Sequence, residues 1–422
     1  MSVYKELEKR GFISQITDSE IEKYLEENKV TVYCGFDPTA ESLHIGNLVP
    51  LMGLAHFQRC GHTVLPLVGG ATGMIGDPSG KSEERNLQSV GQIEKNLEAI
   101  KKQMGIVLDF EGENKAQMVN NYDWTHKMSI LDWLRDVGKH FTISYMLAKD
   151  SVKTRLASES GISYTEFSYM TLQSYDFLHL YRNYGCTMQF GGNDQWGNIT
   201  AGLELIRRVD GGKAFGMTFP LVTTSTGEKF GKSAGNAVWL DAEKTSPYQY
   251  YQYWINVSDE DVEKMLKLFT FIDTEEIDGI CEEHKASPHL RKAQTFLAEE
   301  ATKIMHGEKG LESAKNASAA LFGGDLEGLS EKELRTIFND VPSTVLQKED
   351  IEKGINLSDI LVITKMQSSK GNARRLIEQG GCYINNRKVT DGEFTVDKNS
   401  LLHDSMIIIR NGKKNYHLIS LK

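Results

Sequence analysis

Apolar and polar positions in the first half of the chain predict strands that alternate with helices. Residues 31–35 are β-branched and aromatic, which is typical of a short buried strand. Asp37-Pro38-Thr39 interrupts this run, and from Leu43 the apolar residues recur at helical spacing. Residues 62–68 predict the next strand. Two strands joined by a helix form a right-handed parallel crossover, so we expect a doubly wound parallel α/β sheet of the Rossmann type.

The rest of the chain shows further blocks of each kind. Residues 1–30 have a helical pattern, residues 124–153 space their apolar positions as helices do, and 242–322 lacks strand patterns, which predicts an all-α domain. Further strands are expected at 118–122, 188–190 and 219–223, and further helices at 86–105, 164–181 and 199–208.

The C-terminal part of the chain differs in charge. Residues 323–353 are acidic and predict a connection, whereas 354–422 predict two short helices and a hairpin. The whole chain has a net charge of −10, but 354–422 contains eleven Lys and Arg against six Asp and Glu. A basic segment on an acidic chain favours a nucleic-acid partner for that segment. Its candidate RNA-binding residues are Lys370, Arg374, Arg375, Arg387 and Lys388.

Length and composition limit the class of protein. The chain has 422 residues, of which 40% are apolar, enough for the cores of two or three domains. No apolar run reaches membrane length, and the N-terminus is charged rather than signal-like. Five cysteines without a C-x-x-C spacing argue against a disulfide framework and a structural zinc site. We therefore expect a cytoplasmic protein without a membrane partner.

His44 and Asn47 lie three residues apart at the start of the predicted helix, with Gly46 between them. A helix N-terminus offers unpaired N–H groups and the positive end of the dipole, which favour an anion. A glycine there lets a flat ring or a phosphate approach the backbone. The same pattern also fits a polar βα turn with a surface histidine, and the local sequence leaves both interpretations open.

Residues 69–82 are rich in glycine but do not form a P-loop. That motif needs four residues between its glycines, and Gly76 and Gly80 enclose three. The glycines can instead let backbone approach a ligand, with Asp77 as a carboxylate for an ammonium group. The alternative is a turn in which Asp77 bonds its own backbone.

Three polar residues share one face of the predicted helix at 164–181. Tyr169, Gln173 and Asp176 recur at i, i+4 and i+7, and bulky apolar residues surround them. Buried polar groups require partners. A ligand with an ammonium at one end and a hydroxyl at the other would satisfy all three, as would an internal hydrogen-bond network.

Two loops follow predicted strands and carry further polar residues. Gly192, Asp194 and Gln195 come after the strand at 188–190, at the edge where open α/β sheets bind ligands. Lys229 and Lys232 lie in a glycine-containing loop, consistent with a mobile clamp on phosphates. By itself such a loop is also typical of a solvated turn.

Together these motifs resemble a known enzyme family. His44-Ile45-Gly46-Asn47 and Lys229-Phe230-Gly231-Lys232-Ser233 are similar to the two signatures of class I aminoacyl-tRNA synthetases. Tyr33, Asp77 and residues 169–176 resemble the amino-acid pocket of bacterial tyrosyl-tRNA synthetases, and 354–422 resembles an S4-type RNA-binding domain. The resemblance runs over nearly the whole chain.

The resemblance implies activation of L-tyrosine by ATP, followed by transfer of tyrosine to tRNA(Tyr). It implies that Tyr33 and Asp176 bind the phenol, that Asp77, Tyr169 and Gln173 bind the ammonium, and that Gln195 faces the carboxylate. The residues implied in catalysis at the phosphates are Thr39, His44, Lys81, Arg85, Lys229, Lys232 and Ser233. Those implied in ATP binding are Cys34, Gly35, Asp37, Gly46, Asn47, Gly192, Asp194 and Lys232.

The chain departs from the family pattern at two places. Asn47 stands where histidine is frequent, so it can donate a hydrogen bond but cannot become cationic. Phe230 and Gly231 replace the commoner Met and Ser of K-M-S-K-S, while both lysines remain. The first departure leaves a role at the ATP ribose plausible for Asn47 and puts a charge role in doubt.

The resemblance also implies a domain order and partners. We expect a Rossmann-like catalytic domain at 1–222 with a dimerisation insertion at about 124–160, a signature loop and α-helical domain at 223–322, a linker at 323–353 and an S4-like α+β domain at 354–422. A homodimer is expected, with Mg²⁺ accompanying ATP, no tightly bound cofactor and no dedicated metal ligands.

Three other functions remain open on the sequence. A tryptophanyl-tRNA synthetase would share the fold and the reaction. A nucleotidyltransferase that makes another adenylate would also use the helix N-terminus at His44, but would not explain the loop at 229–233 or the basic tail. A non-catalytic RNA-binding protein would have no need of Asp77, Lys229 and Lys232.

Overall fold

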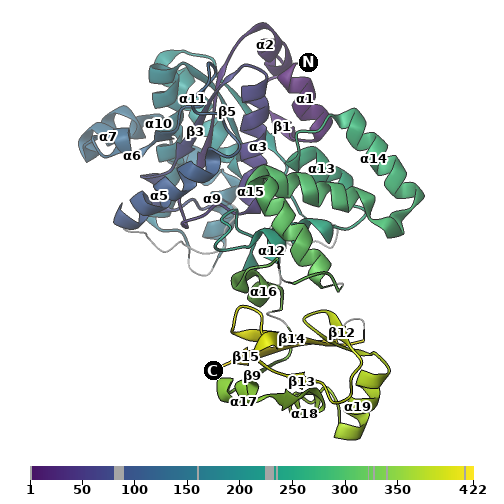
Figure 1. Cartoon of the computed structure of the whole chain (residues 1–422). Coiled ribbons are helices and arrows are strands. Elements are labelled where there is room, and N and C mark those ends of the chain that lie inside the picture. The colour runs from purple at the N-terminus through teal and green to yellow at the C-terminus, as the bar shows by residue number, and fades with distance from the viewer. Residues whose placement is uncertain are drawn as a thin grey trace. The chain divides into compact units, whose positions relative to one another are not determined.

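The structure is a computed structural model that describes residues 2–79, 90–158, 161–223, 232–233, 236–321, 323–326, 328–338, 341–412 and 415–422. The chain divides into two compact units. The first comprises residues 1–244 and 253–305, and the second comprises 245–252 and 306–422. Figure 1 follows both units by colour along the chain.

The first unit contains a six-stranded sheet in the order β1-β6-β5-β2-β3-β4. All neighbouring strands are parallel except β1 and β6, which are antiparallel. The fold class expected from the sequence is thereby confirmed. The strands are β1 (Gln15–Ile16), β2 (Thr31–Phe36), β3 (Thr63–Val68), β4 (Val119–Asn120), β5 (Cys186–Gly192) and β6 (Phe215–Phe219).

The strand order places a topological switch point between β2 and β5. From β2 the chain proceeds outward to β3, whereas from β5 it proceeds in the other direction to β6. Ligands of open α/β sheets bind in the crevice at such a point, beyond the carboxyl ends of the strands. The carboxyl ends of β2 and β5 therefore mark where to look for a site.

Helices cover both faces of this sheet, because right-handed crossovers in opposite directions put their helices on opposite faces. Figure 1 shows β3 and β5 between α3 and α10, and α10 packs along α11. The helices of this part are α1 (Val3–Arg10), α2 (Ile21–Glu27), α3 (Ile45–Arg59), α4 (Thr72–Ile75), α5 (Val90–Met104), α6 (Tyr122–Thr125), α7 (Ile130–Asp136), α8 (Ile143–Leu147), α9 (Asp150–Leu156), α10 (Tyr164–Tyr184) and α11 (Trp196–Asp210), with 3₁₀ turns η1 (Gly138–His140) and η2 (Asn193–Gln195).

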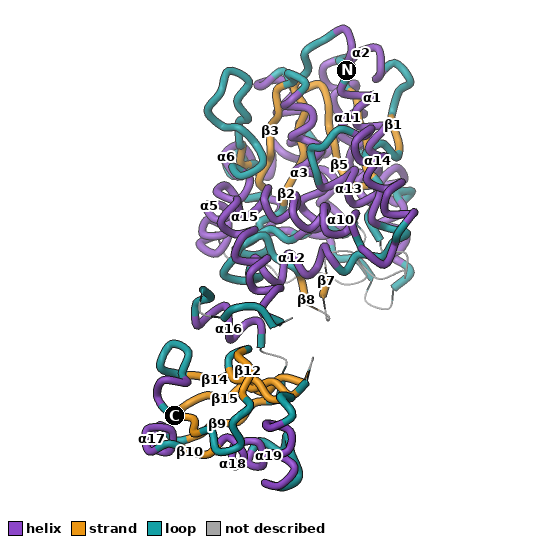
Figure 2. The backbone as a smooth tube through the Cα atoms, turned by 45° about the vertical axis from the view of Figure 1, so that its right-hand side comes forward, coloured by secondary structure: helices purple, strands orange, loops and turns teal. Residues whose placement is uncertain are grey.

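Only helices occur among the described residues from 242 to 321, as the sequence pattern predicts. A two-stranded ribbon, β7 (Lys232–Ser233) with β8 (Asn236–Ala237), precedes them. Figure 2 shows these helices in purple. They are α12 (Pro247–Ile255), α13 (Val262–Phe269), α14 (Thr274–Ala286), η3 (Pro288–Leu290) and α15 (Lys292–Ala320).

The second unit contains a five-stranded sheet in the order β12-β11-β14-β15-β9. The expected two short helices and hairpin are present as α18 (Leu357–Ile363), α19 (Lys370–Glu378) and the antiparallel pair β11 (Cys382–Ile384) and β12 (Arg387–Val389). The other elements are α16 (Glu331–Ile337), β9 (Ser343–Leu346), α17 (Lys348–Lys353), β10 (Ile355–Asn356), β13 (Thr395–Val396), η4 (Lys398–Ser400), β14 (Met406–Asn411) and β15 (Asn415–Leu421).

The segment at 323–353, which the sequence predicts as a connection, contains regular structure instead. β9 pairs in parallel with β15 and so completes the sheet. Leu334 and Phe338 of the α16 region are buried against Met406 and Ile408 of β14. Because the surface residues of this segment are acidic, its composition alone does not indicate that it has an apolar face.

Two expected elements near the first sheet are also corrected. The strand expected at 219–223 is β6, which ends at Phe219, because Pro220 cannot donate to a sheet ladder. The helical pattern expected over residues 1–30 is interrupted by β1, whose Gln15 and Ile16 pair with Thr218 and Met217. This pairing depends on residues two hundred positions away, so no local pattern signals it.

Candidate active site

Tyr33, in the middle of β2, lies beside α10. The Tyr33 ring is buried and meets the ring of Phe177 edge-on, with centroids 5.1 Å apart. Its hydroxyl is buried, and no residue that the structure describes hydrogen-bonds it. Burial and the negative charge of Asp176 raise the Tyr33 pKa well above its usual value. A buried hydroxyl without a protein partner next to a carboxylate is suited to an incoming polar group.

Two donors fix the Asp176 carboxylate, which is only 2% exposed. Oδ2 accepts a hydrogen bond from Asn121 Nδ2 at 2.9 Å, and Oδ1 accepts one from Trp124 Nε1 at 2.8 Å. Burial raises the Asp176 pKa to about 7, the charge of Asp37 adds to the rise, and the two hydrogen bonds oppose it. Each carboxylate oxygen keeps further acceptor capacity for a ligand hydroxyl.

Asp77 lies in a second polar cluster with Gln173 and Gln195. Its Oδ2 accepts from Gln195 Nε2 at 2.8 Å, and Gln195 Oε1 accepts from Gln173 Nε2 at 3.2 Å. Asn198 donates to both Gln173 and Gln195, at 3.0 and 3.2 Å. The turn interpretation of Asp77 holds, since its Oδ1 accepts from the backbone N–H of Ser79. The structure thus brings three of the expected tyrosine-binding residues together.

Tyr169 and Asp176 lie on the same buried stretch of α10. Tyr169 is 4% exposed, so its hydroxyl belongs to the interior rather than to the solvent face of the helix. The expectation that α10 turns a polar face inward is confirmed for both residues. Because α10 packs against both α11 and β5, it lies beside the switch point.

The loop after β2 and the turn after β5 place the residues expected at ATP. Asp37 Oδ1 accepts a hydrogen bond from Thr72 Oγ1 at 3.4 Å, and the charge of Asp37 acts on the Asp176 carboxylate. Asp37 therefore lies closer to Asp176 than a role in ATP binding alone would suggest. The charge of Asp194 contributes to raising the Cys34 pKa to about 12, after burial. A Cβ at Gly192 would lie 2.6 Å from Asp194 Oδ1, so a larger residue here would displace the Asp194 carboxylate. Gly35 is exposed, and Thr39 follows Asp37 in a tight turn, its N–H bonded to the Asp37 carbonyl.

His44 and Asn47 form the N-terminus of α3. Asn47 Oδ1 accepts the backbone N–H of His44 at 3.1 Å, so the amide oxygen of Asn47 caps the start of the helix. A Cβ at Gly46 would lie 2.8 Å from His44 Cε1, which explains glycine at this position. The His44 backbone also bridges to Trp239, whose ring centroid is 6.2 Å from that of His44.

Several expected phosphate-binding residues cannot be placed. Lys81, Arg85 and Lys229 lie outside the described residues. Lys232 and Ser233 belong to the backbone of β7, and their side chains are not described.

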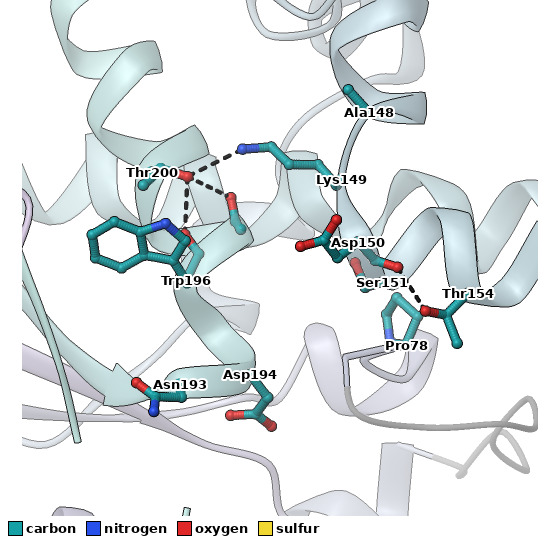
Figure 3. A pocket seen from close by; sticks show the side chains of 11 residues that line it. Pro78, Ala148, Lys149, Asp150, Ser151, Thr154, Asn193, Asp194, Trp196 and Thr200 are labelled. Carbon is teal, nitrogen blue, oxygen red and sulfur yellow. Dashed lines mark hydrogen bonds between the residues drawn. The ribbon is translucent and has the colours of Figure 1, made fainter. Parts of the chain in front are cut away.

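A cavity of about 630 Å³ opens beside the turn after β5. Figure 3 shows Asp194 and Asn193 facing it, together with Pro78, Trp196 and residues of α9. Lys149 reaches across to Thr200, with 3.1 Å between Nζ and Oγ1. Of the expected tyrosine-binding and ATP-binding residues whose side chains are described, only Asp194 lines this cavity, so the cavity is not the cluster of Asp77, Gln173 and Gln195.

Asn121, Trp124 and Asn198 hold the expected site residues but were not predicted as site residues. Asn121 follows directly after β4, at the same carboxyl edge of the sheet, and this placement is a signal that could have identified it. Asn198 lies in the same turn as Gln195. Trp124 gives no such signal, because its role depends on where the short helix α6 packs.

The five expected RNA-binding residues are all exposed on the second unit. Lys370 and Arg374 belong to α19, where they pair with Asp359 and Glu393. Arg387 and Lys388 belong to β12. Arg375 completes the set on α19. Exposed basic side chains can exchange acidic partners for phosphates.

The described residues contain neither a membrane-spanning helix nor a metal-binding cluster. None of their helices combines the length and the apolar character needed to cross a membrane. Among the same residues, no group of three His, Cys, Asp or Glu side chains could hold a metal ion.

Comparison with known proteins connects this site to a family. Residues 25–323 match the family described as class I tRNA synthetases (W and Y), and 333–419 match the SYY-like C-terminal domain of tyrosine–tRNA ligases. The chain is 51% identical to the tyrosine–tRNA ligase of Roseiflexus castenholzii over 426 residues, covering 100% of this chain and 99% of that protein. It is 51% identical to tyrosine–tRNA ligase 1 of Bacillus subtilis over 425 residues, covering 100% of each.

A solved structure supports the same assignment. The C-terminally truncated mitochondrial tyrosyl-tRNA synthetase of Aspergillus nidulans superposes with a TM-score of 0.69 and 32% identity, covering 76% of this chain and 94% of that one. The first family match alone admits either tryptophan or tyrosine, but the full-length relatives are tyrosine–tRNA ligases. The resemblance in the sequence is confirmed, and the chain belongs to the tyrosine–tRNA ligases, a family of class I aminoacyl-tRNA synthetases.

Proposed function

We propose that this enzyme recognises L-tyrosine through two polar ends of one buried cleft. Tyr33 and Asp176 bind the phenol hydroxyl, which donates to the carboxylate and accepts from the Tyr33 hydroxyl. The single observation that carries this proposal is the buried Tyr33 hydroxyl beside Asp176, for which the described residues offer no hydrogen-bond partner. A phenol would satisfy both groups at once.

The other end of the cleft binds the amino-acid backbone. Asp77 is the carboxylate for the substrate ammonium, with Tyr169 and Gln173 as further partners. The Gln195 amide, which now donates to Asp77, turns to the substrate carboxylate when the ammonium takes its place. The exchange keeps every buried polar group paired.

The first step needs position and countercharge rather than a general base. The tyrosine carboxylate is already a nucleophile at pH 7 and attacks the α-phosphate of ATP, which forms tyrosyl-adenylate and releases pyrophosphate. Cys34, Gly35, Asp37, Gly46, Asn47, Gly192 and Asp194 contact the nucleotide, and Thr39, His44, Lys81, Arg85, Lys229, Lys232 and Ser233 stabilise the phosphates. A hydroxyl of the terminal ribose of tRNA(Tyr) then attacks the tyrosyl carbonyl, which forms the ester and releases AMP.

We also propose that Mg²⁺ enters with ATP. This ion keeps several waters and is usually held by substrate phosphates with one or two carboxylates, so it needs no protein cage. Asp37 and Asp194 are the carboxylates at the carboxyl ends of β2 and β5 that could face it. Its chemistry would be to neutralise charge on the phosphates.

Exchange of ATP with labelled pyrophosphate tests the assignment. Tyrosine, and not tryptophan or phenylalanine, is expected to stimulate exchange. Rejection of phenylalanine follows from the polar groups it would leave unpaired; the factor of about 10⁴ to 10⁵ quoted for this effect was measured on tyrosyl-tRNA synthetase itself. Asp176→Ala is expected to lose most tyrosine-dependent exchange while unfolding cooperatively like the parent. Near-parental exchange in this folded variant, or stimulation by tryptophan, would refute the proposed recognition.

A homodimer is the proposed assembly. Within the insertion at about 124–160, apolar side chains are turned to solvent: Ile130 is 68% exposed, Leu131 74% and Ile143 61%. Leu134, Leu147 and Leu156 extend the exposed set over α7, α8 and α9. Apolar groups gathered in one segment of a monomer mark an interaction surface, and a second copy of the chain is its simplest occupant.

The basic residues of α19 and β12 are proposed to contact tRNA phosphates. Their exposure and charge suit a salt-dependent contact that positions RNA without reading its bases. In this proposal residues 1–222 form the catalytic domain, 223–322 the signature loop and α-helical domain, and 354–422 the S4-like domain. The cytoplasm is the proposed location, in keeping with five free cysteines.

A further inference from the structure

His179 stacks face to face on the indole of Trp124. The ring centroids are 4.3 Å apart and the ring planes differ by 14°. Trp124 is buried in an apolar cluster, whereas His179 is half-buried. The imidazole therefore separates one face of the indole from water. The proposed activation of tyrosine leaves this histidine without a role.

Two side chains of α10 hold the same indole. Asp176 and His179 are three residues apart and so share a face of the helix. The Asp176 carboxylate accepts the indole N–H at its edge, and the His179 ring covers its face. In Figure 1, α6, which carries Trp124, lies next to α10. The orientation of the Trp124 N–H thus depends on two side chains of α10.

Asn121 and Trp124 are held in different ways. The Asn121 amide is fixed on both sides, since its Oδ1 accepts from Ala71 N at 2.7 Å and its Nδ2 also donates to Thr72 Oγ1 at 3.0 Å. Trp124 has one N–H, which Asp176 receives, and it belongs to a helix of only four residues. The direction of the Trp124 N–H therefore depends on how the indole ring is packed.

His179 is suited to stacking because its ring is neutral. Burial is the main cause that lowers the His179 pKa, and the positive charges of Arg182 and Lys127 lower it further. Asn183 bonds the His179 carbonyl at 2.9 Å, one turn further along the helix. A flat neutral ring on a helical scaffold is a rigid support for an indole.

We propose that His179 is a positioning residue for tyrosine recognition, which acts by stacking on Trp124 and so fixing the indole N–H that holds Asp176 toward the substrate phenol. This inference rests on the proposed role of Asp176 in binding the phenol. It adds a specificity-supporting residue that touches neither the substrate nor the nucleotide.

The test compares two substitutions at one position. In tyrosine-dependent pyrophosphate exchange, His179→Ala is expected to raise KM for tyrosine about three- to tenfold, the range that an aromatic stack supplies, with KM for ATP unchanged. His179→Phe keeps a ring and is expected to restore KM for tyrosine to near the parental value. The matched control is His126→Ala, which removes a similar stack, at 4.7 Å and 11°, on Tyr122 of the same helix; it is expected to change neither constant.

A double-mutant cycle separates positioning from general packing. Trp124→Phe removes the N–H but keeps a ring, so His179→Ala is expected to add little in that background. The inference is overturned by a parental KM for tyrosine in His179→Ala, by an equal rise in KM for ATP, or by full additivity with Trp124→Phe. If Asp176→Ala is inactive while His179→Ala is parental, the inference alone fails. If Asp176→Ala retains tyrosine activation, the proposed recognition itself fails.

Discussion

Asp176 is a carboxylate that the fold buries at a cost in stability. Its pKa is about 7 in the folded protein, against about 3.9 for an unperturbed aspartate in the unfolded chain. The folded state therefore binds more protons between these values, and its stability falls as the pH rises through them. In the proposed recognition, the ligand hydroxyl that donates to the carboxylate would offset this desolvation cost.

Asp176→Asn is expected to flatten this pH dependence. An amide cannot ionise, so the variant's free energy of unfolding relative to the parent should increase by about 2 kcal/mol between pH 5 and pH 8. One amide N–H will also oppose the donor of Asn121 or Trp124, which lowers stability at every pH without altering the slope. Urea denaturation at several pH values measures the difference. Asp210→Asn is the control: Arg182 lowers the pKa of Asp210, so this carboxylate is ionised in both the folded and the unfolded chain from pH 5 to pH 8, and the profile of the variant should run parallel to that of the parent. A parallel pH profile for Asp176→Asn and the parent contradicts the assignment.

At the scale of elements, the sequence predicts those that bury a continuous pattern. β2, α3, β3, β5 and α10 each carry their own apolar periodicity, and the structure confirms all five within a few residues. β1 and β9 are missed because each is a short strand stabilised by a partner far away in sequence. Local propensity cannot report such pairing.

The candidate site divides in the same way. Asp77, Gln173 and Gln195 come from motifs, and the structure brings them within hydrogen-bond distance of one another. Asn121 and Trp124 act through another residue, so their importance depends on packing that the spacing of residues along the chain does not contain. Motifs therefore identify candidate ligand-binding residues better than they identify the residues that hold such side chains in place.

α9 and α10 are joined by a buried ion pair whose loss we expect to be severe. Arg155 Nε and Nη2 donate to the two oxygens of Glu166 at 2.6 and 2.9 Å, and both side chains are at most 3% exposed. Glu166→Gln removes the carboxylate that binds the buried guanidinium at two points, which should lower the free energy of unfolding by about 3–5 kcal/mol.

The exposed pair Arg182–Asp210 near the other end of α10 is the matched control. It has the same two-point geometry, but Arg182 is 45% exposed. Asp210→Asn is expected to cost about 0–1 kcal/mol in the same denaturant titration. An equal decrease in the free energy of unfolding for Glu166→Gln and Asp210→Asn would show that burial does not determine how much an ion pair stabilises the fold.

At the scale of the whole molecule, the exposed apolar face of α7 predicts how copies of the chain associate. Leu131 is its most exposed large apolar residue, and a charge there would have to be desolvated in a dimer but costs little in a monomer. Leu131→Asp is therefore expected to shift the enzyme from dimer to monomer in sedimentation velocity, with its far-ultraviolet circular dichroism unchanged. Leu290→Asp is the control, because Leu290 is 55% exposed but lies in η3, outside the insertion. A dimer that persists in Leu131→Asp, or one that dissociates in Leu290→Asp, would place the interface elsewhere. Loss of the dimer is also expected to affect the active site. The ring centroids of Trp133 in α7 and Tyr175 in α10 are 5.4 Å apart, and Tyr175 directly precedes Asp176. Dissociation should therefore raise KM for tyrosine more than KM for ATP.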